Sequence, residues 1–539
     1  MPGADAPPPF QTVMTLHAAD WAVLATYGLL LLGAGWWFSR RSAKDAKGYF
    51  LANQAMPVWA VAVSTLATAQ SAATFVGVPE DAFGGNLTYI SASIGGILAA
   101  VILAFTFIPA YYRLGVSTPY QLLETRFGPG AKIVTTSAYM IGRVFASGAR
   151  IYVGAIPVAL ACFGDLSSTT LAITIAGFMV FAVLFTLRGG LESVIWTDVV
   201  QVGVYMGAAL VSVALLWRAI PADTLAVLDA LRSGGPEGTS KLTVLRLGLD
   251  SSAPLGIDFA APFTLITACT GWVLLNLAAF GTDQDLTQRM LTCRNAREGA
   301  RSVIASTLVG IPAVVIFSTI GLLLWVVCRR PDLMGGPIPQ HLTGDAKGLL
   351  LRYALSSGTW GFAGLIIAGV LAAGPAGINA SLNSMAGAFI SDIYRPVLAP
   401  GKDERHYVSA GRWAVAAWGV VLGVFAVLCI WWQKHSGKNI INFVLGVMGF
   451  AYAGLLATFL TALFTRRGST ASVISAMIVG FLVVLALQPN IWAWWTAQTQ
   501  WTTAHLAAVK LASPWRLVIA TMIAFCICVI PAGKAGSPA

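Results

Sequence analysis

Charged residues and cysteines are both scarce in this chain of 539 residues. Asp, Glu, Lys and Arg make up only 10% of the positions, against 57% for hydrophobic residues, and the mean hydropathy is +0.76. A water-soluble domain of this length carries far more charge, so the soluble globular class is excluded. The seven cysteines show no CxxC spacing, which argues against a zinc site or a disulfide framework. No polar stretch is long enough for an appended soluble domain.

Long apolar segments are what the sequence has instead. Each can cross a hydrocarbon core of about 30 Å as a helix, and a helix satisfies its own backbone hydrogen bonds in lipid. We predict an all-α polytopic membrane protein with about 13 transmembrane helices, near residues 18–38, 57–78, 88–112, 133–163, 169–187, 193–217, 262–281, 302–328, 360–391, 409–432, 440–464, 470–487 and 514–531.

The excess of basic residues indicates how the chain is oriented in the membrane rather than binding to nucleic acid. The formal net charge is +11, and in a polytopic chain such an excess is typical of cytoplasmic loops. An N-terminus outside and a C-terminus in the cytoplasm put more of the basic residues on the inner side. The first residues carry no cleavable signal peptide. We expect a multi-pass protein of the inner or plasma membrane that binds no nucleic acid and works as a monomer.

The second and seventh segments are rich in small and polar residues. They read PVWAVAVSTLATAQSAATFVGVP (57–79) and PFTLITACTGWVLLNLAAFG (262–281). Irregular segments at matching places in two halves of a membrane chain indicate a transporter's central binding site, because unwound backbone there lines a cavity. We therefore predict that both helices are interrupted and face each other around a shared polar pocket.

Segments two to six and seven to eleven then form two five-helix halves, and an inverted repeat requires such an odd number of crossings. The predicted organisation is an outer N-terminal tail (1–17), an extra helix and inner loop (18–56), a first five-helix repeat with a long outer loop (57–261), a second repeat (262–464), two additional helices (465–531) and a cytoplasmic tail (532–539).

Three charged residues fall inside predicted membrane segments. Asp198 lies one to two turns into the sixth, and Arg143 and Arg150 share one face of the fourth, two helical turns apart. Charges at this depth are costly and mark functional sites by default. Asp198 is a candidate to coordinate a cation or accept a proton, and Arg143 to clamp an anionic solute group. The alternative is a structural ion pair of Asp198 with an arginine, for which Arg150 is preferred.

The seventh segment ends in GTDQDLTQRMLTCRNAREGARS, an abrupt run of charged and amide side chains. Asp283, Gln284 and Gln288 are candidates for gate or hinge residues. The arginines that follow are expected to be solvated in a cytoplasmic loop: Arg294, Arg297 and Arg301.

Six stretches between positions 17 and 395 resemble a known family. They are residues 17–57, FVGVPEDAFGG, RLGVSTPYQLLETRFG, GGLESVIWTDVVQ, GTDQDLTQRML and ASLNSMAGAFISDIY. Together they resemble the sodium/solute symporter family, which includes sodium-coupled sugar, proline, pantothenate, sialic acid and vitamin carriers. The resemblance implies a LeuT-type fold with a 5+5 inverted repeat, working by alternating access with sodium coupled to solute uptake.

The resemblance also implies a sodium site. In the family, carbonyls of the first core helix and carbonyl and hydroxyl oxygens of the eighth bind the ion. The corresponding positions here are Ala67, Gln70, Ala373, Ala376 and Gly377. Sodium-binding members have serines at the last two positions, so two hydroxyl ligands are missing. Asn379, or a carbonyl freed by Pro375, could replace them, and Asp198 matches the family's inner carboxylate.

For the solute, the family pattern points to the middle of segment two and to segment seven. The candidates are Gln70, Ser71, Thr74, Asn276 and Phe280, with Arg143 where carriers of acidic sugars have a carboxylate-binding arginine. Each alone is equally consistent with helix packing, because Ser, Thr and Gln also hold membrane helices together.

We therefore predict a secondary active transporter that couples a cation, sodium on the family pattern, to uptake of a small polar metabolite, with a slight preference for a carboxylated solute. Its partners are the solute, the cation and membrane lipid. The alternatives are a proton-coupled or uncoupled carrier on the same fold, which Ala376 and Gly377 favour, and a transporter-like solute sensor. No nucleophile or metal-ligand arrangement indicates an enzyme, and no cofactor beyond the coupling ion is expected.

Overall fold

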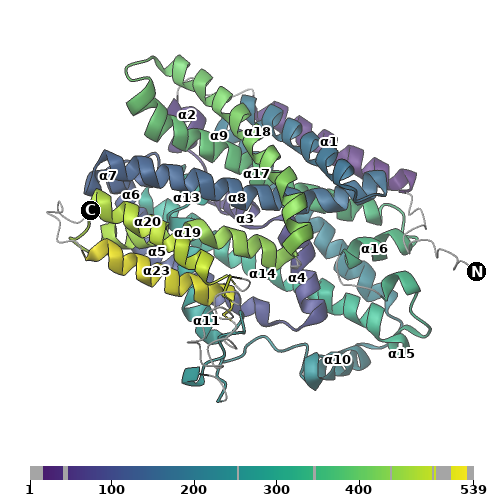
Figure 1. The fold of residues 1–539 in the computed structure, drawn as a ribbon. Helices are drawn as coiled ribbons and strands as arrows, with labels where there is room; N and C mark the ends of the chain where they lie inside the picture. The colour runs from purple at the N-terminus through teal and green to yellow at the C-terminus, as the bar shows by residue number, and fades with distance from the viewer. Residues whose placement is uncertain are drawn as a thin grey trace, which may run out of the picture.

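The computed structural model describes residues 16–39, 46–251, 254–343, 348–436, 440–488, 491–492 and 511–530. Helices occupy every predicted apolar segment, although some segments are divided between two helices and the fifth and sixth share α9 (Figure 1). The predicted tail 532–539, and all but the last two residues of the tail 1–17, lie outside the described residues.

The first half of the chain runs through α1 (Ala18–Ser39), α2 (Ala46–Leu51), α3 (Val58–Ala69), α4 (Ala72–Gly84), α5 (Ala92–Phe105), α6 (Phe107–Leu114), α7 (Tyr120–Phe127), α8 (Pro129–Phe163), α9 (Ser168–Ala219) and α10 (Thr224–Ser233).

The second half runs through α11 (Leu265–Cys269), α12 (Gly271–Gly281), α13 (Gln284–Met290), α14 (Ala296–Arg329), α15 (Pro331–Met334), α16 (Leu349–Ser356), α17 (Phe362–Ala388), α18 (Glu404–Ser436), α19 (Ile440–Phe464), α20 (Thr470–Ala486) and α23 (Ser513–Val529). A π-helix, Phe389–Leu398, continues α17.

The described helices make this a multi-pass membrane protein, as predicted. Six of them are long and apolar enough to cross a membrane, and up to eight if each of two bent helix pairs counts as one span. Four shorter apolar helices and the 35-residue α8 occupy the remaining predicted segments. The total of about 13 crossings, and the division into repeats at 57–261 and 262–464, stay predictions.

Both predicted interruptions are present. The helices on either side of the first break, α3 and α4, meet at 63°, and α12 and α13 meet at 67°. At the first bend the backbone N–H of Ser71 donates to the hydroxyl of Thr74 (3.3 Å), which caps the start of α4. At the second, Asp283 caps α13 by accepting from the N–H of Asp285 (3.0 Å). The second bend therefore follows Gly281, at the end of the predicted segment rather than inside it.

Helix α9 changes direction at Gly190, where φ is +58° and any other residue would be strained. A Cβ there would also lie 3.0 Å from the carbonyl oxygen of Tyr49 on α2. This break separates the predicted fifth and sixth segments. The helix α9 packs against α3, α17 and α1.

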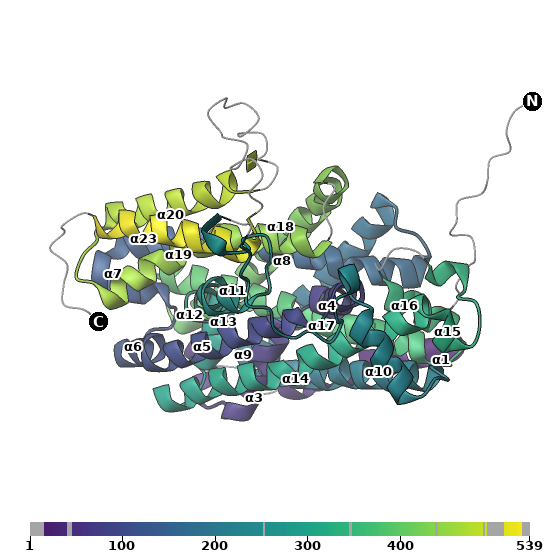
Figure 2. The same cartoon turned by 90° about the horizontal axis from the view of Figure 1, so that it is seen from below.

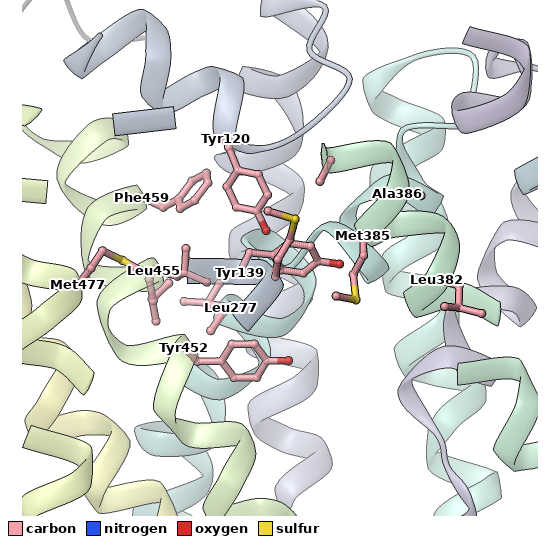
Figure 3. Packing of buried hydrophobic residues seen from close by; sticks show 14 of the residues in the cluster. Tyr120, Tyr139, Leu277, Leu382, Met385, Ala386, Tyr452, Leu455, Phe459 and Met477 are labelled. Atoms are coloured by element: carbon pink, nitrogen blue, oxygen red, sulfur yellow. The ribbon is translucent and has the colours of Figure 1, made fainter. Parts of the chain in front are cut away.

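The apolar core lies where α7, α8 and α19 meet. Figure 3 shows Tyr120, Tyr139 and Phe459 close together there; the ring centroid of Tyr120 is 5.4 Å from that of Tyr139 and 6.3 Å from that of Phe459. On the outside of the bundle α19, α20 and α23 lie side by side, far from α1 (Figures 1 and 2).

The first broken helix is held by a close contact with α14. A Cβ added at Gly321 would lie only 2.2 Å from the backbone carbonyl oxygen of Pro79 in α4. The two helices therefore touch through their backbones, and the small residue is what allows it.

We expect Gly321→Ala to force α4 and α14 apart and to lower the free energy of unfolding by about 1–3 kcal/mol. The measurement is the thermal unfolding midpoint of the purified protein in detergent. Gly310→Ala, on the same helix, is the matched control, because its Cβ would meet Leu66 at an ordinary 3.4 Å. Equal midpoints for the two variants would contradict the close-contact interpretation.

Candidate functional site

A cavity of about 160 Å³ lies where the end of α3 meets α8, α12, α19 and α23; we call it the central cavity. Arg143, Asn276 and Phe280, three of the predicted solute residues, line it together. Arg150 and Tyr452 also line it. Both interrupted segments, through α3 and α12, thus border one shared pocket, as the sequence predicted.

The other predicted solute residues lie elsewhere. Ser71 and Thr74 cap α4, and neither lines the central cavity among the described residues. Gln70 accepts a hydrogen bond from the Tyr205 hydroxyl (3.1 Å) and lines a second, smaller cavity.

The cavity wall carries the first part of a buried chain of charges. Arg143 of α8 pairs with Asp283 through one terminal nitrogen and with Asp285 through the other, at 3.2 Å. The hydroxyl of Tyr452 also donates to Asp283 (2.9 Å). Arg143 thus has its guanidinium held between two carboxylates at the helix break, where the N-terminus of α13 favours negative charge.

The chain of charges continues through α13 to α9. Arg289, one turn after Asp285, contacts that carboxylate at 3.4 Å and pairs with Asp198 of α9 at 2.9 Å. The hydroxyl of Ser64 on α3 donates to Asp198 (2.6 Å) and accepts from Arg289 (2.9 Å). Ser381 of α17 donates to Asp285 (3.2 Å). Side chains from six helices therefore meet along this chain of charges: α3, α8, α9, α13, α17 and α19.

The predicted ion pair of Asp198 with Arg150 is wrong. The partner is Arg289 rather than Arg150, because α13 packs against α3 and α17 and places its arginine 2.9 Å from the carboxylate of Asp198. Arg289 was not among the predicted site residues, yet its side chain is fully buried. The available signal was the four-residue spacing of Asp285 and Arg289 in GTDQDLTQRML, which places both on one helical face. The arginines that follow are exposed, as expected: Arg294, Arg297 and Arg301.

The predicted gate residues lie at the second bend. Gln284 donates to the carbonyl of Ser117 (3.4 Å), and Gln288 to the carbonyl of Phe50 (2.5 Å). With Asp283 at the break itself, they attach α13 to the loop before α7 and to α2. Their role in gating stays a prediction.

The second cavity, which we call the small cavity, measures about 10 Å³ and lies between the end of α3, α9 and α17. It brings together three predicted cation positions, Ala67, Gln70 and Ala373, with Gln201.

The remaining predicted cation residues surround the small cavity without lining it, as far as the chain is described. The carbonyl of Gly377 accepts from Ser381 (2.8 Å), and the amide oxygen of Asn379 accepts from Thr186 (3.4 Å). Asp198 is engaged in the chain of charges. The side chain of Ala376 lies outside the described part of the structure.

A multi-pass helical protein in which two broken helices border a central polar cavity is built as a secondary active transporter. The chain belongs to the Sodium:solute symporter family, whose model matches residues 49–480. It is a sodium-coupled solute symporter and not an enzyme, which confirms the function class predicted from the sequence.

Two relatives and one solved structure illustrate the similarity. The sodium/sialic acid symporter of Proteus mirabilis is 28% identical over 486 residues, covering 87% of this chain and 89% of that protein. The sodium/glucose cotransporter of Vibrio parahaemolyticus is 25% identical over 489 residues, covering 88% of this chain and 86% of that protein. The structure of a substrate-bound, outward-open Na+-coupled sialic acid symporter matches with a TM-score of 0.76 and 23% identity, covering 96% of this chain and 99% of that chain. This match confirms the LeuT-type fold.

We expect Arg289→Met to destabilise the protein by about 3–5 kcal/mol, because it leaves the buried Asp198 without its counter-ion. The readout is the thermal unfolding midpoint in detergent. Arg301→Met removes an exposed arginine nearby and should change little. Adding Asp198→Asn to Arg289→Met should recover part of the loss. If Arg289→Met is as stable as Arg301→Met, the ion pair does not hold α13 in place.

Proposed function

We propose that this symporter imports a small metabolite with a carboxylate group, such as an acidic sugar, and binds it in the central cavity. The observation that carries the proposal is the environment of Arg143, which lines the cavity and is paired with carboxylates on both terminal nitrogens. A guanidinium binds a carboxylate through two parallel hydrogen bonds, so this side chain is already arranged for such a group.

In the proposed binding step the solute carboxylate takes the place of Asp283 on Arg143. Asp283 does not lose all its partners when this happens. It keeps the hydroxyl of Tyr452 and the backbone N–H of Asp285 at the start of α13. The exchange therefore replaces one carboxylate by another on the same guanidinium, and the displaced Asp283 keeps two hydrogen-bond donors but loses its counter-ion, a cost that the other contacts of the solute must offset.

The rest of the cavity suits a polar solute with an apolar face. Trp272 and Phe280 supply aromatic surface. Asn276 donates to the carbonyl of Trp272 (2.7 Å), which leaves its amide oxygen to accept from a solute hydroxyl. A mostly apolar wall with a few oriented polar groups is the usual form of a small-molecule site.

The similar symporter of Proteus mirabilis is named for sialic acid, a sugar acid with a carboxylate, and this supports the proposal. The rival is a neutral sugar, which the relative named for glucose favours. A thermal-shift comparison of sialic and glucuronic acids with glucose, each in sodium buffer, separates the two. If glucose stabilises the protein and neither acid does, the proposal of an acidic solute is wrong.

For the solute identified in this way, we expect Arg143→Lys to weaken binding by roughly tenfold to a hundredfold, because a lysine keeps the charge but loses the paired hydrogen bonds. Affinity is read from the concentration dependence of the thermal shift. Unchanged affinity for the acid in a folded variant would mean that Arg143 does not bind the carboxylate.

Asp283→Asn should have the opposite effect. Asparagine still caps α13 and still accepts from Tyr452, but it no longer competes for Arg143 with a negative charge. We therefore expect tighter binding of the acidic solute in the same assay. In the absence of solute, the thermal unfolding midpoint of the variant should be close to that of the native protein. Weaker binding would show that Asp283 contacts the solute or orients Arg143 instead.

The proposed site for the coupling sodium ion is the small cavity, with the carbonyls of Ala67 and Ala373 and the side chain of Gln70. The end of α3 supports this, since the last carbonyls of a helix lack N–H partners and carry partial negative charge. Farther along α9 and α17, Asp198, Gly377 and Asn379, with Ala376, are proposed to shape the route of the ion rather than its resting site.

The proposed orientation places the N-terminus outside and the C-terminus in the cytoplasm, with a single chain as the working unit. The short helices α6 and α7 lie at one end of the bundle and α15 and α16 at the other (Figure 1). The end with α7 carries Arg126 and Lys132, in accord with a cytoplasmic face. Both cavities lie within one chain, so a monomer has a complete set of sites.

A further inference from the structure

The last described helix, α23, forms part of the wall of the central cavity. Ser513, Pro514 and Leu517 line the cavity together with residues of α3, α8, α12 and α19. The residues that match the family model end at 480, so α23 lies beyond them. It also lies outside the two predicted five-helix repeats. One wall of the proposed solute site is therefore supplied by a helix that neither the family match nor the repeat pattern covers.

The start of α23 touches the backbone of the second interrupted segment. A Cβ added at Gly271, the first residue of α12, would lie 2.5 Å from the Cβ of Pro514 and 2.7 Å from its carbonyl oxygen. Trp272, the next residue of α12, lines the central cavity. The missing side chain at Gly271 thus lets Pro514 pack directly against α12 beside the cavity. The two helices have no room to move closer at this point.

Two further attachments hold the first turn of α23. The backbone N–H of Ala512, which precedes the helix, donates to the carbonyl of Phe259 in the loop before α11 (2.9 Å). The ring centroids of Phe259 and Trp515 lie 5.0 Å apart. Arg516 donates to the amide oxygen of Gln488, just after α20 (2.9 Å). Contacts with three other parts of the chain therefore fix where α23 borders the cavity.

Leu517 lies one turn after Pro514 on this fixed backbone. Its side chain lines the cavity and is otherwise packed in the apolar core, with the residue 4% exposed. Because protein interiors are close-packed, a leucine held in this way has little room to change its rotamer. The cavity walls from α3 and α12 belong instead to interrupted segments, whose breaks allow them to rotate. Leu517 is thus a rigid boundary of the cavity.

We propose that Leu517 is a specificity-determining residue that limits the size of the solute, so that the central cavity accepts a compact sugar acid more readily than a longer one. This inference rests on the proposed function, the binding of a carboxylated solute in that cavity. A carboxylate held by Arg143 fixes one end of the solute, and the remainder must fit within walls that include Leu517. The cavity, at about 160 Å³, is small for a ligand site.

The experiment compares two sugar acids of different length. The purified full chain is heated in detergent and sodium buffer with increasing concentrations of glucuronic acid, which has six carbons, or of sialic acid, which has nine. The concentration that gives half of the stabilisation reports the affinity for each acid, because a ligand that binds the folded state raises its unfolding temperature. The ratio of the sialic to the glucuronic concentration measures the discrimination by size.

We expect Leu517→Ala to lower this ratio roughly tenfold or more, because the vacated space accommodates the longer acid and a single methylene group in such a pocket changes discrimination at least tenfold. The matched control is Val484→Ala on α20. Val484 is equally buried in the same apolar core and does not line the central cavity among the described residues. Its truncation should lower stability and leave the ratio unchanged.

The outcomes separate this inference from the proposed function. A native protein that neither acid stabilises overturns the proposed solute, and the size limit with it. A native protein that responds, with an unchanged ratio in Leu517→Ala, overturns only the role of Leu517. An equal fall of the ratio in Val484→Ala also overturns that role, since the ratio would then follow core packing. Should Leu517→Ala not fold, Leu517→Val is measured: the ratio should fall by a smaller factor, and an unchanged ratio contradicts the proposal.

Discussion

Charges buried among membrane helices must be neutralised by partners on other helices, and this requirement fixes the centre of the protein. Asp283, Arg143, Asp285, Arg289 and Asp198 alternate in sign from the central cavity to α9. Removing Arg143 or Arg289 leaves Asp283 or Asp198 without its counter-ion, which is far more costly than losing one packing contact. The short helix α13 supplies Asp285 and Arg289, and Asp283 caps its start, so its position decides how α3, α8, α9 and α17 sit around it.

The same ion pairs join the two cavities. Arg143 stands on the wall of the central cavity, and Asp198 stands one turn from Gln201, which lines the small cavity. Between them lies a continuous series of charged contacts instead of an apolar layer. Electrostatic interactions act over longer distances and more strongly in a medium of low dielectric than in water. A rearrangement at the solute end therefore alters the surroundings of Asp198.

The helix breaks give both cavities their chemistry. Where α3 ends, its last carbonyl groups lack helical N–H partners, and residues at this end line both cavities: Ala67 the small one and Ala69 the central one. Where α13 begins, free N–H groups and the helix dipole stabilise the carboxylates that hold Arg143. Small residues such as Gly321 let the helices around these breaks pack closely enough to exclude lipid from the site.

The sequence by itself determined the membrane class, the family, the two interrupted helices and the grouping of Arg143, Asn276 and Phe280. The membrane class follows from apolar length and the interrupted helices from local composition, whereas the family, and with it the set containing Arg143, Asn276 and Phe280, follows from the resemblance of the motifs. Only the tertiary structure decided that Arg289 pairs with Asp198, that Gln70 belongs to the small cavity and that α23 borders the central cavity. Spacing tells which residues share a helical face, but the rotation and packing of whole helices determine what that face meets.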